Sequence, residues 1–382
     1  MQIVFISNYY NHHQKFLSNE LEKRCNLFKF ISTSKMREER KKLGYGEEEI
    51  PQYVIEYSNE KEAEIYKLIE KSSVVIWGAA PSKMVNRKVR RNDIVFKYTE
   101  RPFKNKDVWW KYVPRFVVWH RQNPINKRIY MLCASAFASG DYSKYFLFKN
   151  KSFKWGYFPE TKKYDIQQLL KNKSKTRILW CGRFLDWKHP DELLEVARLL
   201  KREDYKFEIC FIGTGELEEQ LKEKVLEYQL EESVSFVGAM PPAQVRKYME
   251  EAGMYVFTSD RREGWGVVLN EAMNSGCAVI ASHLIGSVPY LINNNENGLV
   301  YKSGEIQQLY EKIKYLLEYP EEQERLGSSA YKTISEVWNA EVAAERFIRL
   351  SEGIMQGKKV SDMYINGPCS KAEIIKEDWL NE

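Results

Sequence analysis

Apolar residues in the first half of this chain form short continuous runs, separated by longer segments with helical spacing. The runs predict strands at 3–6, 74–77, 94–98 and 129–133, and the spacing predicts helices over 13–24 and 61–71. Residues 104–126 contain two prolines and follow neither pattern. Short apolar strands alternating with amphipathic helices predict a parallel sheet with crossover helices.

The second half repeats this alternation more regularly. Strands are predicted at 178–181, 207–212, 234–237, 254–258, 278–281 and 299–301, each followed by a turn or a helix. Pro190 begins one of these helices, with Asp191 and Glu192 in its first turn, where both residue types are favourable. Each half therefore predicts its own α/β domain. We expect domains over 1–165 and 166–337, joined by a linker within 162–176, and a helix and tail over 338–382 that packs back on the first domain.

The net charge of +6 is unevenly distributed over the 382 residues. Residues 83–163 contain 20 Lys and Arg against 5 Asp and Glu, interleaved with Trp109, Trp110, Phe116 and Trp119. This density indicates an anionic partner, and the alternative is a solvated basic face.

The remaining composition favours a cytoplasmic protein. The six cysteines are scattered without a paired motif, which is typical of reduced thiols, and no apolar run reaches the roughly 18–20 residues of a membrane span. There is no Asp-x-Asp pair and no His or Cys cluster with ligand spacing, so we expect no metal.

Basic residues and glycines follow the first two predicted strands of the second half. Gly182, Arg183 and Lys188 follow the first strand, and Gly213 and Gly215 follow the second. In doubly wound sheets ligands bind beyond the carboxyl ends of the strands, where Arg and Lys suit a diphosphate and glycines allow close approach. The alternatives are ordinary surface charge and a simple tight turn.

The segment EGWGVVLNE carries the most specific pattern. Its glycines, Gly264 and Gly266, bring a loop close to a ligand, and Glu263 and Glu271 are spaced so that both carboxylates reach one bound molecule. Carboxylates accept hydrogen bonds from sugar hydroxyls. The alternative is that Glu263 caps the helix and Glu271 is an exposed surface residue.

Residues 177–350 resemble the retaining glycosyltransferases of family 4. The resemblance rests on CGRFLDWKHPDELLE, FIGTGELEEQL and EGWGVVLNE, taken together with their spacing. It implies the GT-B architecture, in which two Rossmann-like doubly wound domains face each other across a cleft. It also implies transfer of a hexose-type sugar from a UDP- or GDP-linked donor, which is a substrate, so that no cofactor is expected.

The resemblance implies a role for each matching residue. Arg183 and Lys188 would bind the donor diphosphate, Glu263 the sugar hydroxyls and Glu271 the ribose. Backbone groups would complete the donor site, with Gly264, Trp265 and Gly266 along the sugar and phosphates, and Gly238, Ala239 and Met240 at the base.

The first half departs from the family pattern on the acceptor side. Where many relatives have a glycine-rich loop after the first strand, this chain has Asn11, His12 and His13, and where relatives often have a cleft histidine it has Glu100 and Arg101. Glu100 is therefore our candidate for a catalytic group beside Arg183, Lys188 and Glu263. The alternatives are that Asn11 caps a helix and that Glu100 pairs with Arg101.

The expected acceptor is a glycan or a polyprenyl-linked sugar in cell-envelope polysaccharide synthesis. The basic region then predicts docking on the anionic inner face of a membrane, through Trp109, Trp110 and cations that include Lys83, Arg87, Lys88, Arg90, Arg91, Lys104, Lys106 and Lys111. The alternative is that the tryptophans are core residues and the cations bind a soluble acidic glycan.

Two other functions compete with this interpretation. One is a GT-B phosphorylase or sugar epimerase. The other is a nucleic-acid-binding protein that uses residues 83–163, against which the missing RNA-binding signatures argue, so we expect no nucleic-acid partner.

Overall fold

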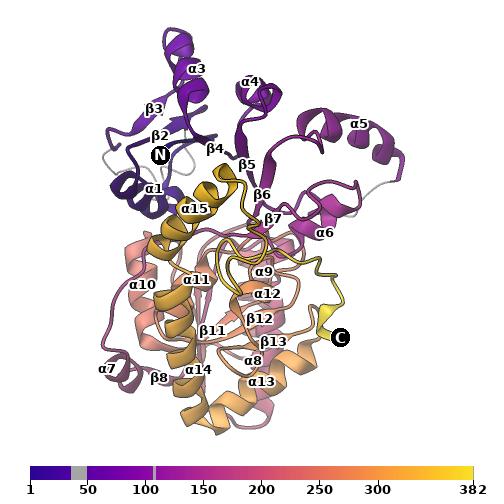
Figure 1. The fold of residues 1–382 in the computed structure, drawn as a ribbon. Helices are drawn as coiled ribbons and strands as arrows, with labels where there is room; N and C mark the ends of the chain where they lie inside the picture. Colours follow the sequence, from indigo (N-terminus) through magenta and orange to yellow (C-terminus); the bar gives the residue numbers. More distant parts are fainter. Residues whose placement is uncertain (36–49, 106–108, 382) are drawn as a thin grey trace. The chain divides into compact units, whose positions relative to one another are not determined.

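The computed structural model describes residues 1–35, 50–105 and 109–381 of the chain. Contacts divide the chain into two compact units (Figure 1). Unit 1 contains Met1–Pro159 and Trp338–Lys376, and unit 2 contains Glu160–Val337 and Glu377–Glu382. The expected domain limits, 1–165, 166–337 and 338–382, stay a prediction.

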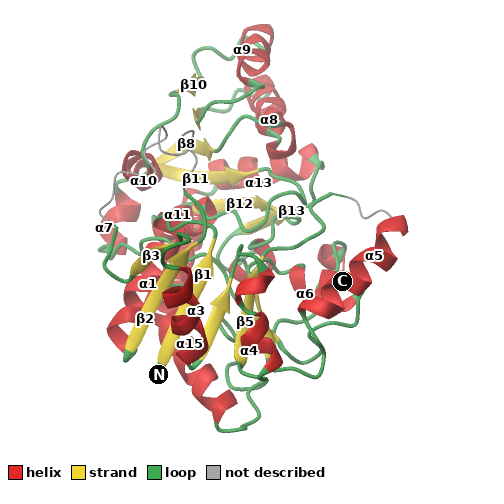
Figure 2. Ribbon diagram, turned by 90° about the horizontal axis from the view of Figure 1, so that it is seen from above, coloured by secondary structure: helices red, strands yellow, loops and turns green. Residues whose placement is uncertain are grey.

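Unit 1 is built on a seven-stranded sheet in which every paired strand runs parallel. Figure 2 shows its strands β2 and β1 as neighbouring arrows that run in the same direction. Ile3, Val4, Phe5 and Ile6 of β1 are fully buried, as expected of a central parallel strand covered on both faces. The order across the sheet is β3 (Val54–Glu56), β2 (Leu27–Ser32), β1 (Gln2–Ser7), β4 (Val74–Trp77), β5 (Ile94–Thr99), β6 (Ile129–Cys133) and β7 (Ser152–Lys154).

The last helix of the chain, α15 (Ala340–Met355), belongs to unit 1. Its Phe347 ring lies 4.8 Å from Phe96 and 5.8 Å from Trp155, measured between ring centroids. The tail beyond it covers the edge of β7, where the Lys154 amide donates to the Ser370 carbonyl at 2.7 Å, so this edge is not left unpaired. The other helices are α1 (His12–Arg24), α3 (Glu62–Lys71), α4 (Asn86–Arg90), α5 (Tyr112–Gln122) and α6 (Ala138–Ser143).

Unit 2 has a six-stranded parallel sheet. The order is β10 (Val234–Phe236), β9 (Glu208–Ile212), β8 (Ser174–Cys181), β11 (Ala252–Phe257), β12 (Ala278–Ser282) and β13 (Leu299–Tyr301). Its helices are α7 (Ile166–Lys171), α8 (Pro190–Arg202), α9 (Glu218–Glu227), α10 (Pro242–Glu251), α11 (Val268–Asn274), α12 (Val288–Leu291), α13 (Ile306–Glu318) and α14 (Pro320–Lys332).

The α/β class with two parallel sheets is confirmed, and the differences are local. The strands β2, β3 and β7 were not expected, because Lys29 interrupts the apolar run of β2 and the other two strands have only three residues each. Residues 104–126 contain a helix, α5, whose Pro114 lies in the first turn, where proline does not break an intrahelical bond. The expected linker 162–176 contains helix α7 and the start of β8.

Glycines set how closely the loops after β8, β9 and β10 approach one another. Gly213 has φ of +137°, and a Cβ added to it would lie 1.8 Å from the Gly182 carbonyl oxygen. The Gly182 amide donates to the Ile212 carbonyl at 3.0 Å, and the Gly213 amide donates to the Gly238 carbonyl at 2.9 Å. Three neighbouring strand ends are thereby joined through their backbones.

We predict that Gly213→Ala destabilises unit 2 more than Gly304→Ala does. Both glycines have positive φ, but a Cβ at Gly304 meets nothing within 4 Å. Gly304→Ala then carries only the backbone strain, about 1 kcal/mol, while Gly213→Ala adds a backbone clash and loses about 2 kcal/mol or more. Urea unfolding of both variants measures the difference, and equal losses would contradict the close approach.

Candidate functional site at the strand ends of unit 2

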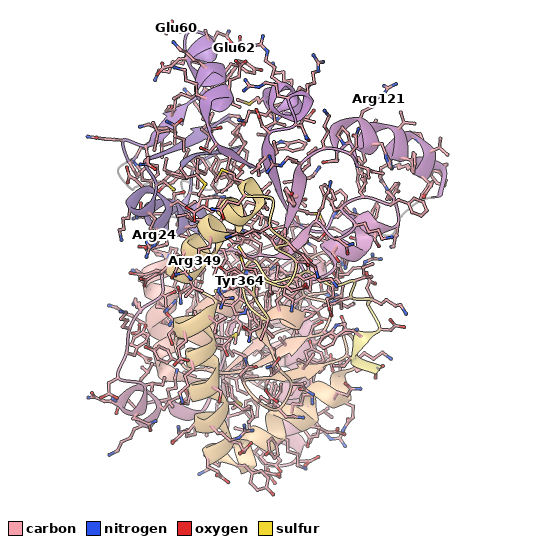
Figure 3. The ribbon with its side chains drawn as sticks, in the orientation of Figure 1. Arg24, Glu60, Glu62, Arg121, Arg349 and Tyr364 are labelled. Atoms are coloured by element: carbon pink, nitrogen blue, oxygen red, sulfur yellow. The ribbon has the colours of Figure 1, made fainter. Side chains whose placement is uncertain are left out.

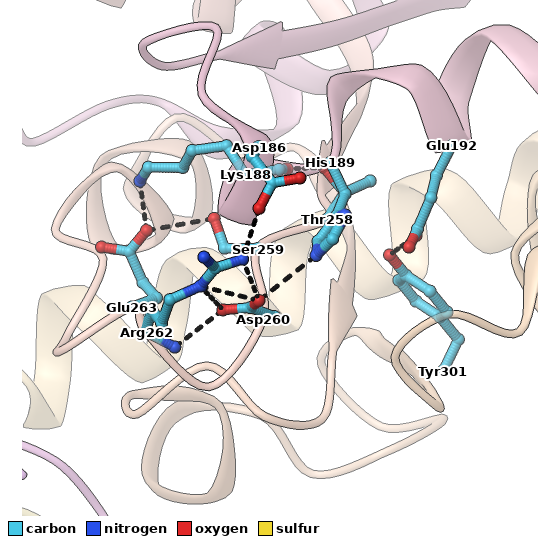
Figure 4. Close-up of polar contacts among 10 residues, drawn as sticks. All are labelled: Asp186, Lys188, His189, Glu192, Thr258, Ser259, Asp260, Arg262, Glu263 and Tyr301. Atoms are coloured by element: carbon cyan, nitrogen blue, oxygen red, sulfur yellow. Dashed lines mark hydrogen bonds and ion pairs between the residues drawn. The ribbon is translucent and has the colours of Figure 1, made fainter. Parts of the chain in front are cut away.

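Lys188 and Glu263 form an ion pair beyond the ends of two neighbouring strands (Figure 4). Lys188 lies in a short turn after β8, and Glu263 lies in the loop after β11. The Lys188 Nζ contacts Glu263 Oε2, and the Ser259 hydroxyl donates to the same oxygen at 3.0 Å. Both charged side chains are only 12% exposed, so water screens the pair less than a surface pair. The structure therefore brings together two of the residues that the sequence predicted.

Hydrogen bonds from side chains and from the backbone hold the two loops in this arrangement. The Thr258 hydroxyl donates to the Lys188 carbonyl at 2.5 Å and accepts from the Trp180 indole N–H at 2.9 Å. The Asp260 amide donates to the Trp187 carbonyl at 3.0 Å. Because β8 and β11 are adjacent in the sheet, these contacts lock the loop after one strand to the loop after the other.

A second group of charged residues, which was not predicted from the sequence, lies next to the first along the same two loops. Asp260 Oδ2 lies 3.3 Å from His189 Nε2 and 2.8 Å from Arg262 Nη2, while Arg262 also pairs with Asp186 at 2.9 Å. Burial by itself would raise the pKa of the Asp260 carboxyl, but the hydrogen bonds from His189 and Arg262 lower it below its usual value. The hydrogen bond to Asp260 also raises the pKa of His189. The signal was present, since Asp260 and Arg262 follow the end of β11 just before Glu263.

Arg183 follows Gly182 at the end of β8, and its side chain is exposed. In the part of the chain that the structure describes, no ion pair or hydrogen bond engages its guanidinium. The neighbouring glycines Gly213 and Gly215 are explained first by loop packing, because a Cβ at Gly215 would lie 2.4 Å from the Phe184 carbonyl oxygen. A guanidinium exposed at a strand end has its five donors available for an anion.

Glu271 lies on α11 and is partly buried. Burial raises the pKa of its carboxyl to about 7, partly offset by the charge of Arg246. Burial raises the pKa of the Cys181 thiol to about 12, and the negative charge of Glu271 contributes to this rise. Glu271 therefore lies close to the end of β8, where Cys181 is the last residue. A carboxyl that titrates near pH 7 can accept hydrogen bonds once it is ionised.

The glycines of the EGWG segment and the aromatic between them have different roles. Gly266 has φ of +78°, and a Cβ there would lie 2.5 Å from the Phe257 ring. The Trp265 ring is buried, and its indole N–H donates to Asn270 at 2.8 Å, so this side chain is a core residue. Only backbone groups of Gly264, Trp265 and Gly266 remain as ligand candidates. The loop of Gly238, Ala239 and Met240 follows β10, where Gly238 accepts the bond from Gly213.

In unit 1, Asn11 caps α1, accepting from the His13 amide at 2.8 Å. The interpretation of Asn11 as a helix cap thus holds. The rings of His12 and His13 lie 3.8 Å apart, and the His13 ring lies 5.6 Å from Tyr157.

Glu100 contacts Tyr157, which was not predicted from the sequence as a site residue. Its carboxylate accepts from Tyr157 Oη at 3.0 Å and from Lys104 Nζ at 2.5 Å. The suggested pairing of Glu100 with Arg101 was wrong, because Arg101 is 3% exposed and pairs with Asp141 at 3.4 Å, while Glu100 bonds to Tyr157 and Lys104. Tyr157 therefore links His13 and Glu100, while Arg101 has a structural role.

The described residues contain no group of three or more His, Cys, Asp or Glu arranged to hold a metal. Within the same part of the chain, every helix is too short or too polar to cross a bilayer. Metal independence stays a prediction.

The chain is similar in sequence to known glycosyltransferases. Residues 161–333 match the family described as glycosyl transferases group 1. The chain is 35% identical over 138 residues to the amylovoran biosynthesis glycosyltransferase AmsK of Erwinia amylovora, covering 35% of this chain and 34% of the relative. It is 30% identical over 179 residues to an uncharacterized glycosyltransferase of Haemophilus influenzae, covering 45% of this chain and 50% of the relative. The chain thus spans about a third to a half of the length of these curated relatives.

A solved structure shares the whole fold. The Anabaena protein Alr3699/HepE, crystallised in complex with UDP, superposes with a TM-score of 0.68 at 16% identity, covering 93% of this chain and all of that one. Together with other neighbours it shows that the fold is GT-B.

The pKa of Glu271 predicts a pH-dependent stability. The unfolded carboxyl ionises near pH 4.5 and the folded one near 7, so the folded state keeps its proton longer and the free energy of unfolding falls as pH rises between these values. Relative to wild type, Glu271→Gln should gain up to about 2–3 kcal/mol across this window. Urea unfolding at pH values on either side of the window measures the gain. The exposed Glu216→Gln serves as control, and an identical pH response in both variants would contradict the burial effect.

Proposed function

Because residues 161–333 match the family described as glycosyl transferases group 1, we propose that the protein is a retaining glycosyltransferase. It moves a hexose-type sugar from a nucleotide-diphosphate-sugar to a glycan or lipid-linked acceptor. The observation that carries this proposal is the Lys188–Glu263 pair in the loops that follow the adjacent strands β8 and β11, with the exposed Arg183 also following β8.

The proposed mechanism follows from where charge develops. Breaking the bond to the anomeric carbon places negative charge on the departing diphosphate and positive charge on the sugar ring. Lys188 and Arg183 supply cations for the diphosphate, and because Lys188 is already held by Glu263 and Thr258, it needs little reorganisation. This preorganisation lowers the barrier without a metal ion.

Two carboxylates would position the donor. Glu263, already bonded to Ser259 and Lys188, has a second oxygen with which to accept from a sugar hydroxyl. Glu271 would accept from the ribose hydroxyls in its ionised form. Raising the pH through about 7 should therefore strengthen binding of a nucleotide sugar, whose diphosphate does not titrate there.

The donor and acceptor are proposed from the relatives. The Anabaena structure was solved with UDP, which supports a UDP-linked donor over a GDP-linked one. AmsK is named for amylovoran biosynthesis, which supports a role in polysaccharide synthesis. On the acceptor side, Glu100 and His13 are our candidates to contact the acceptor, with Tyr157 between them.

We further propose that α5 docks on an anionic membrane surface. No residue of this helix is buried, and Val113 and Val117, four residues apart on one face, are 69% and 43% exposed. Trp110 just before the helix is 61% exposed, and Arg121 at its end points away from the rest of unit 1 (Figure 3). Apolar residues beside cations fit the headgroup boundary of an anionic bilayer.

The structure narrows the set of cations that the sequence proposed for this surface. Lys88 is 2% exposed and donates to the Ser72 carbonyl at 2.6 Å, so its inclusion was wrong. Trp119 packs on Tyr142, with 4.6 Å between ring centroids, and belongs to the core side of α5. Lys106 lies outside the described residues.

We predict that Lys188→Ala lowers turnover of UDP-sugar on the order of 10²-fold or more, through loss of a cation that contacts the leaving group. Initial rates measure the loss, with melting temperature as a check on folding. The matched control is Lys206→Ala, an exposed lysine on the same unit, which should keep wild-type turnover. Near-normal turnover in Lys188→Ala would overturn the proposed donor site.

We also predict that the protein co-sediments with vesicles of phosphatidylcholine and phosphatidylglycerol but not with phosphatidylcholine alone. Added salt should weaken the binding, and Val113→Asp with Val117→Asp should abolish it by placing charge on the apolar face. The control is Leu226→Asp, an exposed apolar residue of unit 2. Equal binding to both vesicle types, or none to either, would contradict the proposal.

A further inference from the structure

Residues 377–379 belong to unit 2 and contact the main part of that unit at two places. Glu377 pairs with Arg261, with 3.0 Å between Oε1 and Nη2. The Trp379 indole N–H donates to the His283 carbonyl at 3.1 Å, and the His283 side chain is hydrogen-bonded to the backbone of Glu377. The chain up to Lys376 belongs to unit 1, so this short segment is separate from the rest of the tail.

His283 is a rigid anchor for the segment. It follows β12, is 6% exposed, and its amide donates to the Tyr301 carbonyl at 3.0 Å, while its Nδ1 accepts from the Ser303 amide at 3.0 Å. Both ends of its side chain and its carbonyl are therefore engaged. A segment bonded twice to so firmly held a residue is itself fixed in position.

Arg261 lies in the loop after β11 that carries Glu263. It stands between Asp260 and Arg262, whose side chains pair with each other, and two residues before Glu263, which pairs with Lys188. The Glu377–Arg261 pair therefore reaches from a fixed segment to the loop of residues 259–266 that carries the predicted sugar-binding carboxylate.

We propose that Glu377 and Trp379 are positioning residues, which hold the 259–266 loop in the geometry that binds the donor. The effect on donor binding rests on the proposed function, whereas the restraint of the loop does not. A partly exposed ion pair stabilises a protein little by itself. Here one partner is already anchored to His283, so less entropy is lost on forming the pair, and small displacements of a substrate-contacting group have large effects on transfer.

The test compares Glu377→Ala and Trp379→Phe with Asp378→Ala, which removes a neighbouring exposed carboxylate. The first readout is hydrogen exchange of the amides of residues 259–266 in the protein without donor. We expect faster exchange in Glu377→Ala and Trp379→Phe, and wild-type exchange in Asp378→Ala. Trp379→Phe keeps the aromatic ring and removes only the N–H donor, so it should still fold.

The second readout is the KM for UDP-sugar, which should rise about threefold to tenfold in both variants, with a smaller change in kcat. Unchanged exchange in the loop overturns the inference. Faster exchange with an unchanged KM overturns the positioning role. If wild-type protein binds no nucleotide sugar, the proposed function fails, and the exchange readout still decides whether the segment restrains the loop.

Discussion

The candidate site depends on how closely the strand-end loops of unit 2 approach one another. Gly213 lies against the Gly182 carbonyl at a distance that excludes any side chain. This contact determines where the chain goes after β8, and hence where the turn bearing Lys188 lies. From there, Thr258 bonds the Lys188 carbonyl and brings the end of β11 to the same place. The charged groups can meet only because the backbone has first been brought together.

The charged residues of the site form two groups, which differ in how many of their hydrogen-bonding positions are already occupied. Asp260, His189, Arg262 and Asp186 are bonded to one another and stabilise the loop. Lys188 and Glu263 are bonded to each other but retain donor and acceptor positions, and Arg183, which follows the same strand as Lys188, is exposed. Under the proposed function this division has a reason, since supporting groups hold the geometry and the less engaged groups meet the changing charge of the reaction.

In unit 1, the candidate acceptor residues are held together by contacts with an aromatic side chain. Tyr157 touches the Glu100 carboxylate and packs near His13. Burial and the Glu100 charge hold the pKa of the Tyr157 hydroxyl well above its usual range, so Tyr157 stays a hydrogen-bond donor to Glu100 at neutral pH. A substrate that approaches Glu100 would meet a carboxylate whose orientation is already fixed by two donors.

The sequence by itself determined the alternation of strands and helices, the two parallel sheets, and the presence of Arg183 and Lys188 after one strand and Glu263 after another. These properties follow from local periodicity and from the rule that ligands lie beyond the carboxyl ends of parallel strands. Strand β7 was missed because it has only three residues and obtains its second partner from the tail.

Only the tertiary structure decided which charges pair. Arg101 pairs with Asp141, and Glu100 accepts a hydrogen bond from Tyr157. Lys88 is buried, and Asp260 pairs with His189 and Arg262. It also decided that residues 377–379 contact Arg261 and His283, more than 90 positions earlier in the chain. Partners so distant in sequence leave no periodic signal, because an ion pair depends on the position and direction of two side chains in space, and those are set by packing.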